Sequence, residues 1–95
     1  MFPFERMDTN ADMKRLAAAL RSRRRTLGLT QLELSELAGC GVAFLYALER
    51  GKATVRLDKV IAVLRVLGLS LVLTEGRAPV SVEESLASSS DAADG

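Results

Sequence analysis

The chain has 95 residues, 48% of them hydrophobic and 26% charged, which suffices for one small folded domain with tails and excludes a second domain. It contains no histidine, no tryptophan and one cysteine, Cys40. Zinc-finger ligand sets, histidine-based catalytic pairs and an internal disulfide therefore lack the residues to build them. We expect a protein that is not an enzyme, with no catalytic residues, no metal site and no cofactor.

The charge is distributed unevenly along the chain. The net charge of the whole is +1, but residues 1–74 carry +5 and residues 75–95 carry −4. A basic folded part indicates a polyanionic partner. The last residues turn to Ser, Ala, Asp and Gly, a composition that predicts an acidic flexible tail over residues 75–95. Residues 1–10 show no periodicity, so we expect an N-terminal arm there and a folded domain over residues 11–74.

The sequence also carries information about the compartment. The N-terminal residues MFPFERMDTN have no signal-peptide core, and no apolar run approaches the roughly 20 residues of a membrane span. A lone thiol suits a reducing compartment. We therefore expect a cytoplasmic protein with no membrane partner.

The first predicted helix covers residues 11–26, and Gly28 ends it as a left-handed cap. Thr30 then begins a second helix over residues 31–38, with Glu33 three residues later completing a capping box. Apolar side chains recur at helical spacing along the first helix and its end and predict its buried side: Met13, Leu16, Ala17, Leu20 and Leu27.

The second helix stops at a Gly-Cys-Gly turn, residues 39–41, and a third helix is expected over residues 42–49. Two short helices joined by a tight glycine turn form a helix-turn-helix. A fourth helix is predicted over residues 57–67, where apolar residues again recur at helical spacing, and Gly68 ends it.

Residues 69–73 are β-prone and predict a single strand. A single strand leaves unpaired amides and carbonyls on both edges, so it needs a partner, and a second copy of itself is the simplest one. We therefore expect a homodimer with antiparallel pairing of this strand and with Val63 and Val66 of the fourth helix beneath it. The dimerisation residues of the strand are Leu69, Leu71, Val72 and Leu73.

Residues 20–51, LRSRRRTLGLTQLELSELAGCGVAFLYALERG, closely resemble the Cro/repressor type of helix-turn-helix regulators. The sequence that follows, VRLDKVIAVLRVLGLSLVL, is similar to HipB-like antitoxins, where a strand follows the fourth helix. This resemblance, over residues 14–73, implies an all-α, lambda-repressor-like domain of four helices with one C-terminal strand pairing across a dimer. It also implies that the third helix lies in the major groove, so that a dimer binds two half-sites of double-stranded operator DNA about 34 Å apart.

The same resemblance assigns backbone contacts. Gln31 lies at a helix N-terminus, where free amides and the helix dipole favour a phosphate, and the family places a phosphate-contacting Gln there; the alternative is a solvated residue beside a cap. Arg24 and Glu49 are implied to pair behind the DNA-facing surface, with Arg24 also within reach of a phosphate. Five other basic residues flank the motif: Arg23, Arg25, Arg50, Lys52 and Arg56. They are either contacts to DNA phosphates or simply a solvated charged surface.

The positions that face base edges in the family hold Gly41, Val42, Ala43, Tyr46 and Ala47. None of them is Arg, Asn, Gln or Lys, so the bidentate pairs that identify guanine or adenine are missing. Contacts to thymine methyl groups, the Tyr46 hydroxyl and DNA shape remain. Either the protein recognises AT-rich DNA weakly and gains affinity from dimer spacing, or its DNA role has been lost.

Two further features lie outside the DNA contacts. Cys40 is expected to be a buried structural residue, because the sequence offers it no resolving thiol. Leu32 and Leu37 fall off the buried stripe of a short helix, where an exposed pair of leucines would form a contact patch for a partner.

The function we expect is a DNA-binding transcriptional repressor. The HipB-like resemblance implies that it represses its own operon and neutralises a HipA-like serine/threonine kinase toxin by binding it. Two alternatives stay open: a stand-alone regulator without a toxin, and a protein-interaction module that kept the fold without specific DNA recognition.

Overall fold

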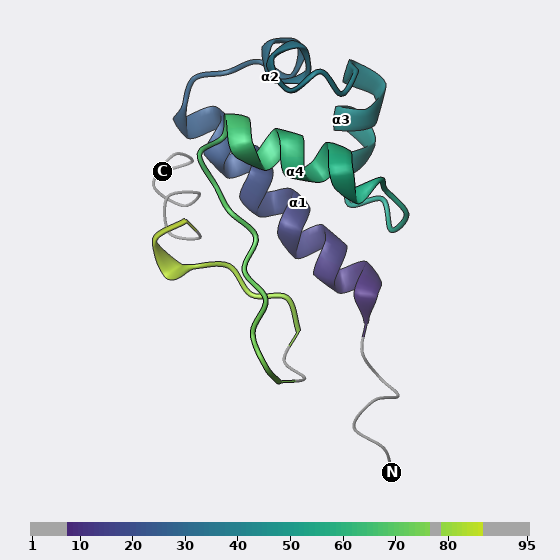
Figure 1. Cartoon of the computed structure of the whole chain (residues 1–95), viewed down its shortest axis with the longest axis vertical. Coiled ribbons are helices and arrows are strands. Elements are labelled where there is room, and N and C mark those ends of the chain that lie inside the picture. Colours follow the sequence, from purple (N-terminus) through teal and green to yellow (C-terminus); the bar gives the residue numbers. More distant parts are fainter. Residues whose placement is uncertain (1–7, 77–78, 87–95) are drawn as a thin grey trace.

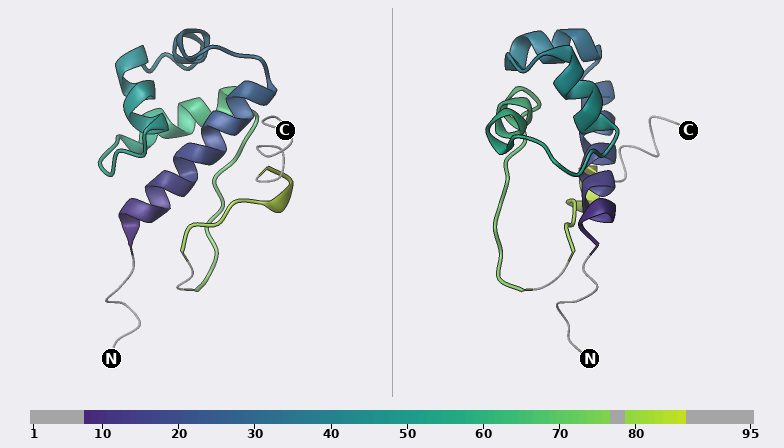
Figure 2. Two further views of the ribbon diagram at one scale, coloured as in Figure 1. Left: turned by 180° about the vertical axis from the view of Figure 1, so that it is seen from behind. Right: turned by 90° about the vertical axis from the view of Figure 1, so that its right-hand side faces the viewer.

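The computed structural model describes residues 8–76 and 79–86. The body of the protein consists of four helices, α1 (Thr9–Thr26), α2 (Gln31–Ala38), α3 (Val42–Glu49) and α4 (Leu57–Val66), and residues 84–86 are also helical (Figure 1). α2 packs against α3 and α4, and α1 packs against α3. In Figure 2, α2 and α3 lie together at one end of the molecule, with α1 and α4 below them. The helical helix-turn-helix domain expected from the sequence is confirmed, and none of its helices is long and apolar enough to cross a membrane.

The helix boundaries follow local capping signals. Thr30 Oγ1 accepts a hydrogen bond from the Glu33 amide at 3.0 Å, and Glu33 Oε1 accepts one from the Thr30 amide at 2.8 Å, so the predicted capping box forms and α2 begins where expected. Gly28 adopts a left-handed φ of 74° after α1, which confirms the predicted stop. α1 begins two residues earlier than predicted, because Asp8 caps it by accepting from the Ala11 amide at 3.0 Å.

Two glycines are required by the backbone on either side of α3. Gly41 precedes the helix with a φ of 83°, a conformation that residues with a β-carbon rarely adopt. Gly51 follows the helix with a φ of 82°, and a β-carbon there would lie 3.2 Å from Lys14 Cα. Gly51 therefore allows the loop after α3 to pass close to the backbone of α1.

The core forms where the four helices meet. It contains the buried side chains of Leu20, Leu34, Cys40, Leu45, Leu48, Val60, Val63, Leu64 and Leu67. Two sequence predictions are wrong here. Val63 was expected beneath a dimer strand, but it is completely buried in the core of its own protomer, because the buried side of α4 includes Val60, Val63 and Leu64. Leu27 was expected in the core, but it lies beyond the last turn of α1 and is exposed.

The chain after α4 leaves the helical body as an exit segment, residues 69–76. Leu69 packs against the core, whereas Leu71, Val72 and Leu73 are exposed, with Leu73 at 92%. The described residues contain no strand, so the predicted strand over residues 69–73 is absent from the single protomer. A ladder needs a second strand to supply its hydrogen bonds, and the predicted second strand belongs to another copy.

Residues 79–86 form a return segment that runs back along α1 (Figure 1). The Val80 amide donates to Asp12 Oδ1 at 3.1 Å, and Arg15 Nη1 donates to the Val80 carbonyl at 2.8 Å. Together with α1 and the exit segment, the return segment encloses a cleft of about 810 Å³. Part of the tail expected to be flexible therefore has a defined course beside α1; the N-terminal arm at residues 1–7 and tail residues 77–78 and 87–95 lie outside the described residues.

Candidate nucleic-acid interface

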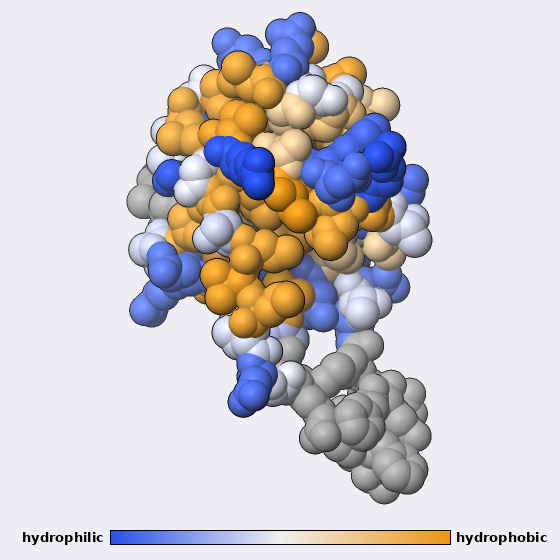
Figure 3. Space-filling model, viewed as in Figure 1, coloured by the Kyte–Doolittle hydropathy of each residue, from blue (hydrophilic) through white to orange (hydrophobic). Residues whose placement is uncertain are grey.

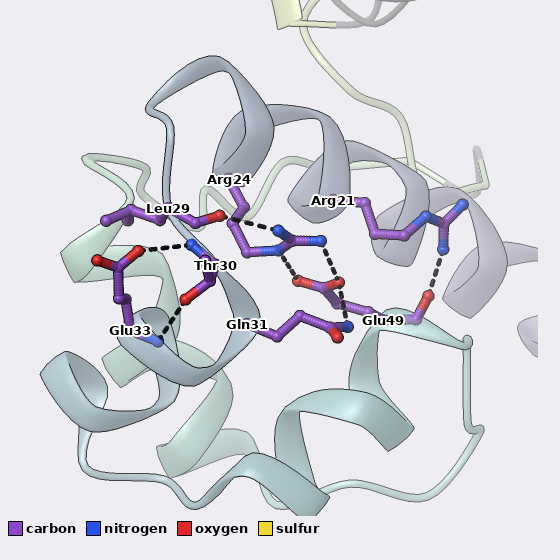
Figure 4. Close-up of polar contacts among 7 residues, drawn as sticks. All are labelled: Arg21, Arg24, Leu29, Thr30, Gln31, Glu33 and Glu49. Carbon is purple, nitrogen blue, oxygen red and sulfur yellow. Dashed lines mark hydrogen bonds and ion pairs between the residues drawn. The ribbon is translucent and has the colours of Figure 1, made fainter.

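A buried polar cluster joins the first three helices at the start of the helix-turn-helix (Figure 4). Arg24 of α1 donates through Nε to Glu49 Oε2 at 2.8 Å and through Nη2 to Oε1 at 3.1 Å. Gln31 of α2 donates through Nε2 to the same Oε1 at 2.9 Å. The Glu49 side chain, at the end of α3, is only 1% exposed. The predicted pairing of Arg24 with Glu49 is confirmed, and Gln31 belongs to the same cluster.

This Arg24–Gln31–Glu49 cluster fixes how α3 is held. Arg24 also donates through Nη1 to the Leu29 carbonyl at 2.9 Å, in the loop between α1 and α2. Arg21 Nη1 donates to the Glu49 main-chain carbonyl. Since a buried carboxylate is costly unless it is paired and hydrogen-bonded, these contacts hold the end of α3 against α1 and α2 in one orientation.

The cluster also limits the contacts that its members can make with DNA. Most of the Arg24 guanidinium is occupied by Glu49 and Leu29, so its role in the structure is to position α3. Gln31 uses one of its two amide hydrogens on Glu49 and keeps a second for another acceptor. The phosphate contact expected at Gln31 is thus compatible with the cluster, and it remains a prediction.

The outer side of α3 carries the five residues expected to face base edges. Gly41 and Ala43 are exposed, Tyr46 is 48% exposed, and Val42 and Ala47 are half-buried. The opposite side, formed by Leu45, Leu48 and Glu49, is buried. The structure therefore brings the five predicted residues together on one small, largely apolar surface.

The basic residues around the motif differ in their partners. Arg50 and Lys52 follow α3 and are exposed, and they form no ion pair among the described residues. Arg56 is also exposed, but its Nε and Nη2 bind the two carboxylate oxygens of Asp58 at 3.1 and 2.6 Å. This hydrogen-bonded pairing lowers the pKa of Asp58 and compensates the charge of Arg56, which leaves Arg50 and Lys52 as the stronger phosphate candidates.

At the other flank of the motif, Arg25 is exposed, whereas Arg23 is half-buried and donates through Nε to the Leu67 carbonyl at 2.9 Å. Sequence reasoning missed this closure of the C-terminal end of α4. It also missed the hydrogen bond of Arg21 to the Glu49 main-chain carbonyl, because no pattern of side chains in the sequence indicates a main-chain acceptor. A run of arginines in the last turns of a helix signals carbonyl contacts in general, but it does not identify the acceptors.

Two further observations bear on the chemistry of the site. Among the described residues, no group of Asp, Glu, Cys or His side chains is arranged to hold a metal ion. The Cys40 thiol lies buried in the turn between α2 and α3, as expected, and its Sγ is 3.5 Å from the Gly41 carbonyl. Burial raises the pKa of this thiol, which keeps it in the unreactive protonated form.

The chain belongs to the helix-turn-helix family, since residues 20–73 match the family model HTH_3. It is also similar to the uncharacterized HTH-type transcriptional regulator y4mF of Sinorhizobium fredii (strain NBRC 101917 / NGR234). The two sequences are 40% identical over 67 residues, which cover 70% of this chain and 84% of the relative. No solved structure matches the chain.

Proposed function

We propose that the protein is a DNA-binding transcription regulator in which α3 enters the major groove. The observation that carries this proposal is the Arg24–Gln31–Glu49 cluster, which holds α3 rigidly from behind while its outer side stays exposed beside Arg50 and Lys52. Membership of the helix-turn-helix family and a relative that is named as a transcriptional regulator support it. The net charge of +5 on residues 1–74 favours a polyanion.

Phosphate contacts supply most of the affinity in this proposal. Arg50 and Lys52 bind the backbone on one side of α3, and the N-terminus of α2 with the second amide hydrogen of Gln31 binds it on the other. Arg25 is a further candidate for a phosphate contact. Arg56 contributes less, because its ion pair with Asp58 neutralises part of its charge. Arg24 acts through Glu49 by orienting α3.

The protein acts as a homodimer in this proposal, and the exit segment joins the two copies. Leu71, Val72 and Leu73 expose apolar side chains on a segment without a strand partner in its own protomer. Figure 3 shows apolar side chains gathering over α4 and over the segment that follows it. Antiparallel pairing of residues 69–73 across a two-fold axis would satisfy the open backbone groups and cover this surface, with half-buried Val66 at its edge.

The finer proposal is that this regulator is the antitoxin of a HipA-like serine/threonine kinase and represses the operon that encodes both. It rests on the HipB-like sequence of residues 55–73. A surface suited to a protein partner is present on α2, where Leu32 and Leu37 are 56% and 64% exposed. Copurification with the kinase and loss of its activity on binding would support this proposal, whereas a regulator without a toxin would bind DNA alone.

A second candidate function is a protein-interaction module without specific DNA recognition. The observation that favours it is the outer side of α3, which carries no side chain able to form a bidentate pair with a base. The two candidates differ in one measurable property, since only a DNA-binding protein shows duplex affinity that depends steeply on salt.

The test is a titration of the protein with duplexes selected from random sequence, at a series of salt concentrations. We expect log affinity to fall linearly with log salt. Arg50→Ala and Lys52→Ala should each weaken binding to all sequences and reduce the salt slope by about 1 for each phosphate that a subunit no longer binds. Arg65→Ala removes a positive charge from α4 and serves as the control with an unchanged slope. A flat salt response, or no binding to any duplex, would contradict the proposal.

A further inference from the structure

The outer side of α3 is chemically uniform. Its exposed and half-buried positions hold Gly41, Val42, Ala43, Tyr46 and Ala47. The charged side chain of α3, Glu49, points into the cluster with Arg24 and is buried. The Tyr46 hydroxyl is therefore the one polar side-chain group that α3 presents outward.

The major groove offers few features that such a surface can recognise. Guanine and adenine are identified by paired donors and acceptors, and cytosine by a donor that needs a side-chain acceptor. Thymine alone among the four bases presents an apolar group, its C5-methyl. A cytosine methylated at C5 presents the same group at the same place in the groove.

From this match, and resting on the function proposed above, we propose that α3 recognises the C5-methyl groups of pyrimidines, in thymine and in 5-methylcytosine. Ala43, Tyr46 and Ala47 are the contacting side chains. They are spaced i, i+3 and i+4, so they lie side by side along one side of the helix. Gly41 and the two alanines are small, which lets α3 approach the base edges closely enough for contact with a methyl group.

The aromatic ring supplies most of this apolar surface. Tyr46 is 48% exposed, and its neighbours on the same side of α3 are the methyl groups of the two alanines. A ring edge and two methyl groups form a shallow surface suited to one or two methyl groups in each half-site. Sequence-dependent DNA shape can also select AT-rich DNA without methyl contacts, and the experiment has to separate these two origins of selectivity.

Replacing thymine by deoxyuridine makes that separation, since it removes only the methyl group and keeps the base pairing. We would replace each thymine of the selected duplex in turn and measure the dissociation constant. Burial of one methyl group corresponds to about a fourfold change in affinity. We expect about a fourfold loss at each contacted thymine and about a 15-fold loss when the symmetric pair is replaced.

The complementary test uses the same duplex and asks whether adding a methyl group increases its affinity for the protein. Replacing a contacted T·A pair by C·G removes the methyl group, and replacing it by 5-methylcytosine·G restores the methyl group at that step. We expect the methylated duplex to bind about fourfold more tightly than the unmethylated C·G duplex. Equal binding of the two duplexes would overturn the inclusion of 5-methylcytosine.

A protein variant then assigns the contact to α3. Ala43→Ser places a hydroxyl at an exposed position of the first turn, where serine is tolerated. In this variant, replacing one of the contacted thymines by deoxyuridine should no longer weaken binding. Leu37→Ala on α2 removes an exposed apolar side chain outside α3, and it should leave every deoxyuridine loss unchanged. Circular dichroism and the salt slope verify that both variants fold and contact phosphates normally.

The possible outcomes separate this inference from the proposed function. If no deoxyuridine replacement weakens binding while the salt-dependent affinity persists, methyl recognition is wrong and DNA binding stands. If the losses occur but are unaffected by Ala43→Ser, the assignment of the methyl contact to α3 is wrong and DNA binding stands. If no duplex binds at any salt concentration, the proposed function fails and the inference fails with it.

Discussion

The helix-turn-helix and the chain that follows α4 differ in what determines their structure. In residues 30–51, helix starts and stops depend on partners close in sequence, such as the hydrogen bonds between Thr30 and Glu33. In residues 69–86, the chain depends on distant contacts, such as that between Val80 and Asp12, 68 residues apart. Local hydrogen bonds set the helix ends of the first region, although Arg24 of α1 also holds the end of α3 there. The second region is held by α1 and, in our proposal, by a second copy.

The two regions also differ in how they bury polar groups. The helix-turn-helix contains a carboxylate, that of Glu49, which is buried and bound by Arg24 and Gln31. The ion pair of the return segment's anchor, Arg15 with Asp12, lies at the surface. Substitutions in the first region should therefore cost much more stability than substitutions in the second.

The largest effect is expected for Glu49→Ala. Removing this carboxylate leaves the buried guanidinium of Arg24 without its partner, which commonly costs about 3 to 5 kcal/mol. This is a large part of the stability of a small domain, so the variant should be unfolded or nearly so at room temperature. Thermal melting followed by circular dichroism measures the change.

Asp58→Ala is the matched control for that experiment. It breaks an ion pair of similar length, with Arg56, whose two side chains are both about two-thirds exposed, at 68% and 65%. Solvent screens such a pair, so the melting temperature should change only slightly. A Glu49→Ala variant that melts within a degree or two of the unsubstituted protein would show that the cluster does not stabilise the fold.

The next effect concerns assembly through the exit segment. Leu71→Pro removes one backbone donor and restricts φ, which is incompatible with the centre of a paired strand. We expect the dimer to dissociate while the four helices stay intact, since residue 71 lies outside all of them. Sedimentation equilibrium measures the association, and circular dichroism monitors the helices.

Leu71→Ala is the companion variant, because it keeps the backbone donor and removes only the side chain. A larger loss of association for proline than for alanine indicates strand pairing, and equal losses indicate side-chain packing. An unaltered dimer in the proline variant would refute pairing of residues 69–73, although another surface could still join the copies.

Sequence reasoning predicted the helices well because their signals are local. The bounds of α2 and α3 match the prediction, and Thr30 and Gly28 have the predicted caps. It was less successful on which side of α4 is buried. Almost every residue between Val60 and Leu67 is apolar, so several stripes fit the sequence equally, and only the packing of α2 against α4 selects the one that includes Val63.

The candidate site was also predicted from the sequence only in part. Arg24 and Glu49 could be paired from the resemblance, and the exposed position of Tyr46 agrees with its place in the pattern. The bond from Gln31 to Glu49 was not foreseen, because it depends on how two helices meet. The partners of Val80 could not be predicted either, since nothing near it in sequence indicates α1.

A smaller effect is expected when the chain is truncated after Glu75. The truncation removes the two hydrogen bonds of Val80 to α1, both exposed to solvent, which should contribute about 1 kcal/mol or less in total. The acidic residues removed with it would otherwise mildly repel DNA. We expect a slightly lower melting temperature, an intact dimer, and DNA binding at least as strong as that of the full chain.

Arg15→Ala tests whether the return segment is the cause of that small loss. In the full chain this substitution should lower the melting temperature, and in the truncated chain its effect should shrink because Val80 is already absent. Equal effects in both chains would indicate that Arg15 acts only through Asp12. A truncated protein that no longer dimerises would place the tail inside the folded unit.

The smallest effect is expected at Cys40, in the turn of the helix-turn-helix. Burial raises the pKa of its thiol above the value in the unfolded chain, so the folded state holds this proton more tightly. The associated stabilisation is complete below the unfolded pKa of about 8.5 and is lost as the pH rises through the folded pKa. As the pH rises above about 8.5, the unsubstituted protein should therefore lose more stability than Cys40→Ala. The difference in melting temperature between the two proteins measures this, and a difference independent of pH would show that the thiol titrates equally in both states.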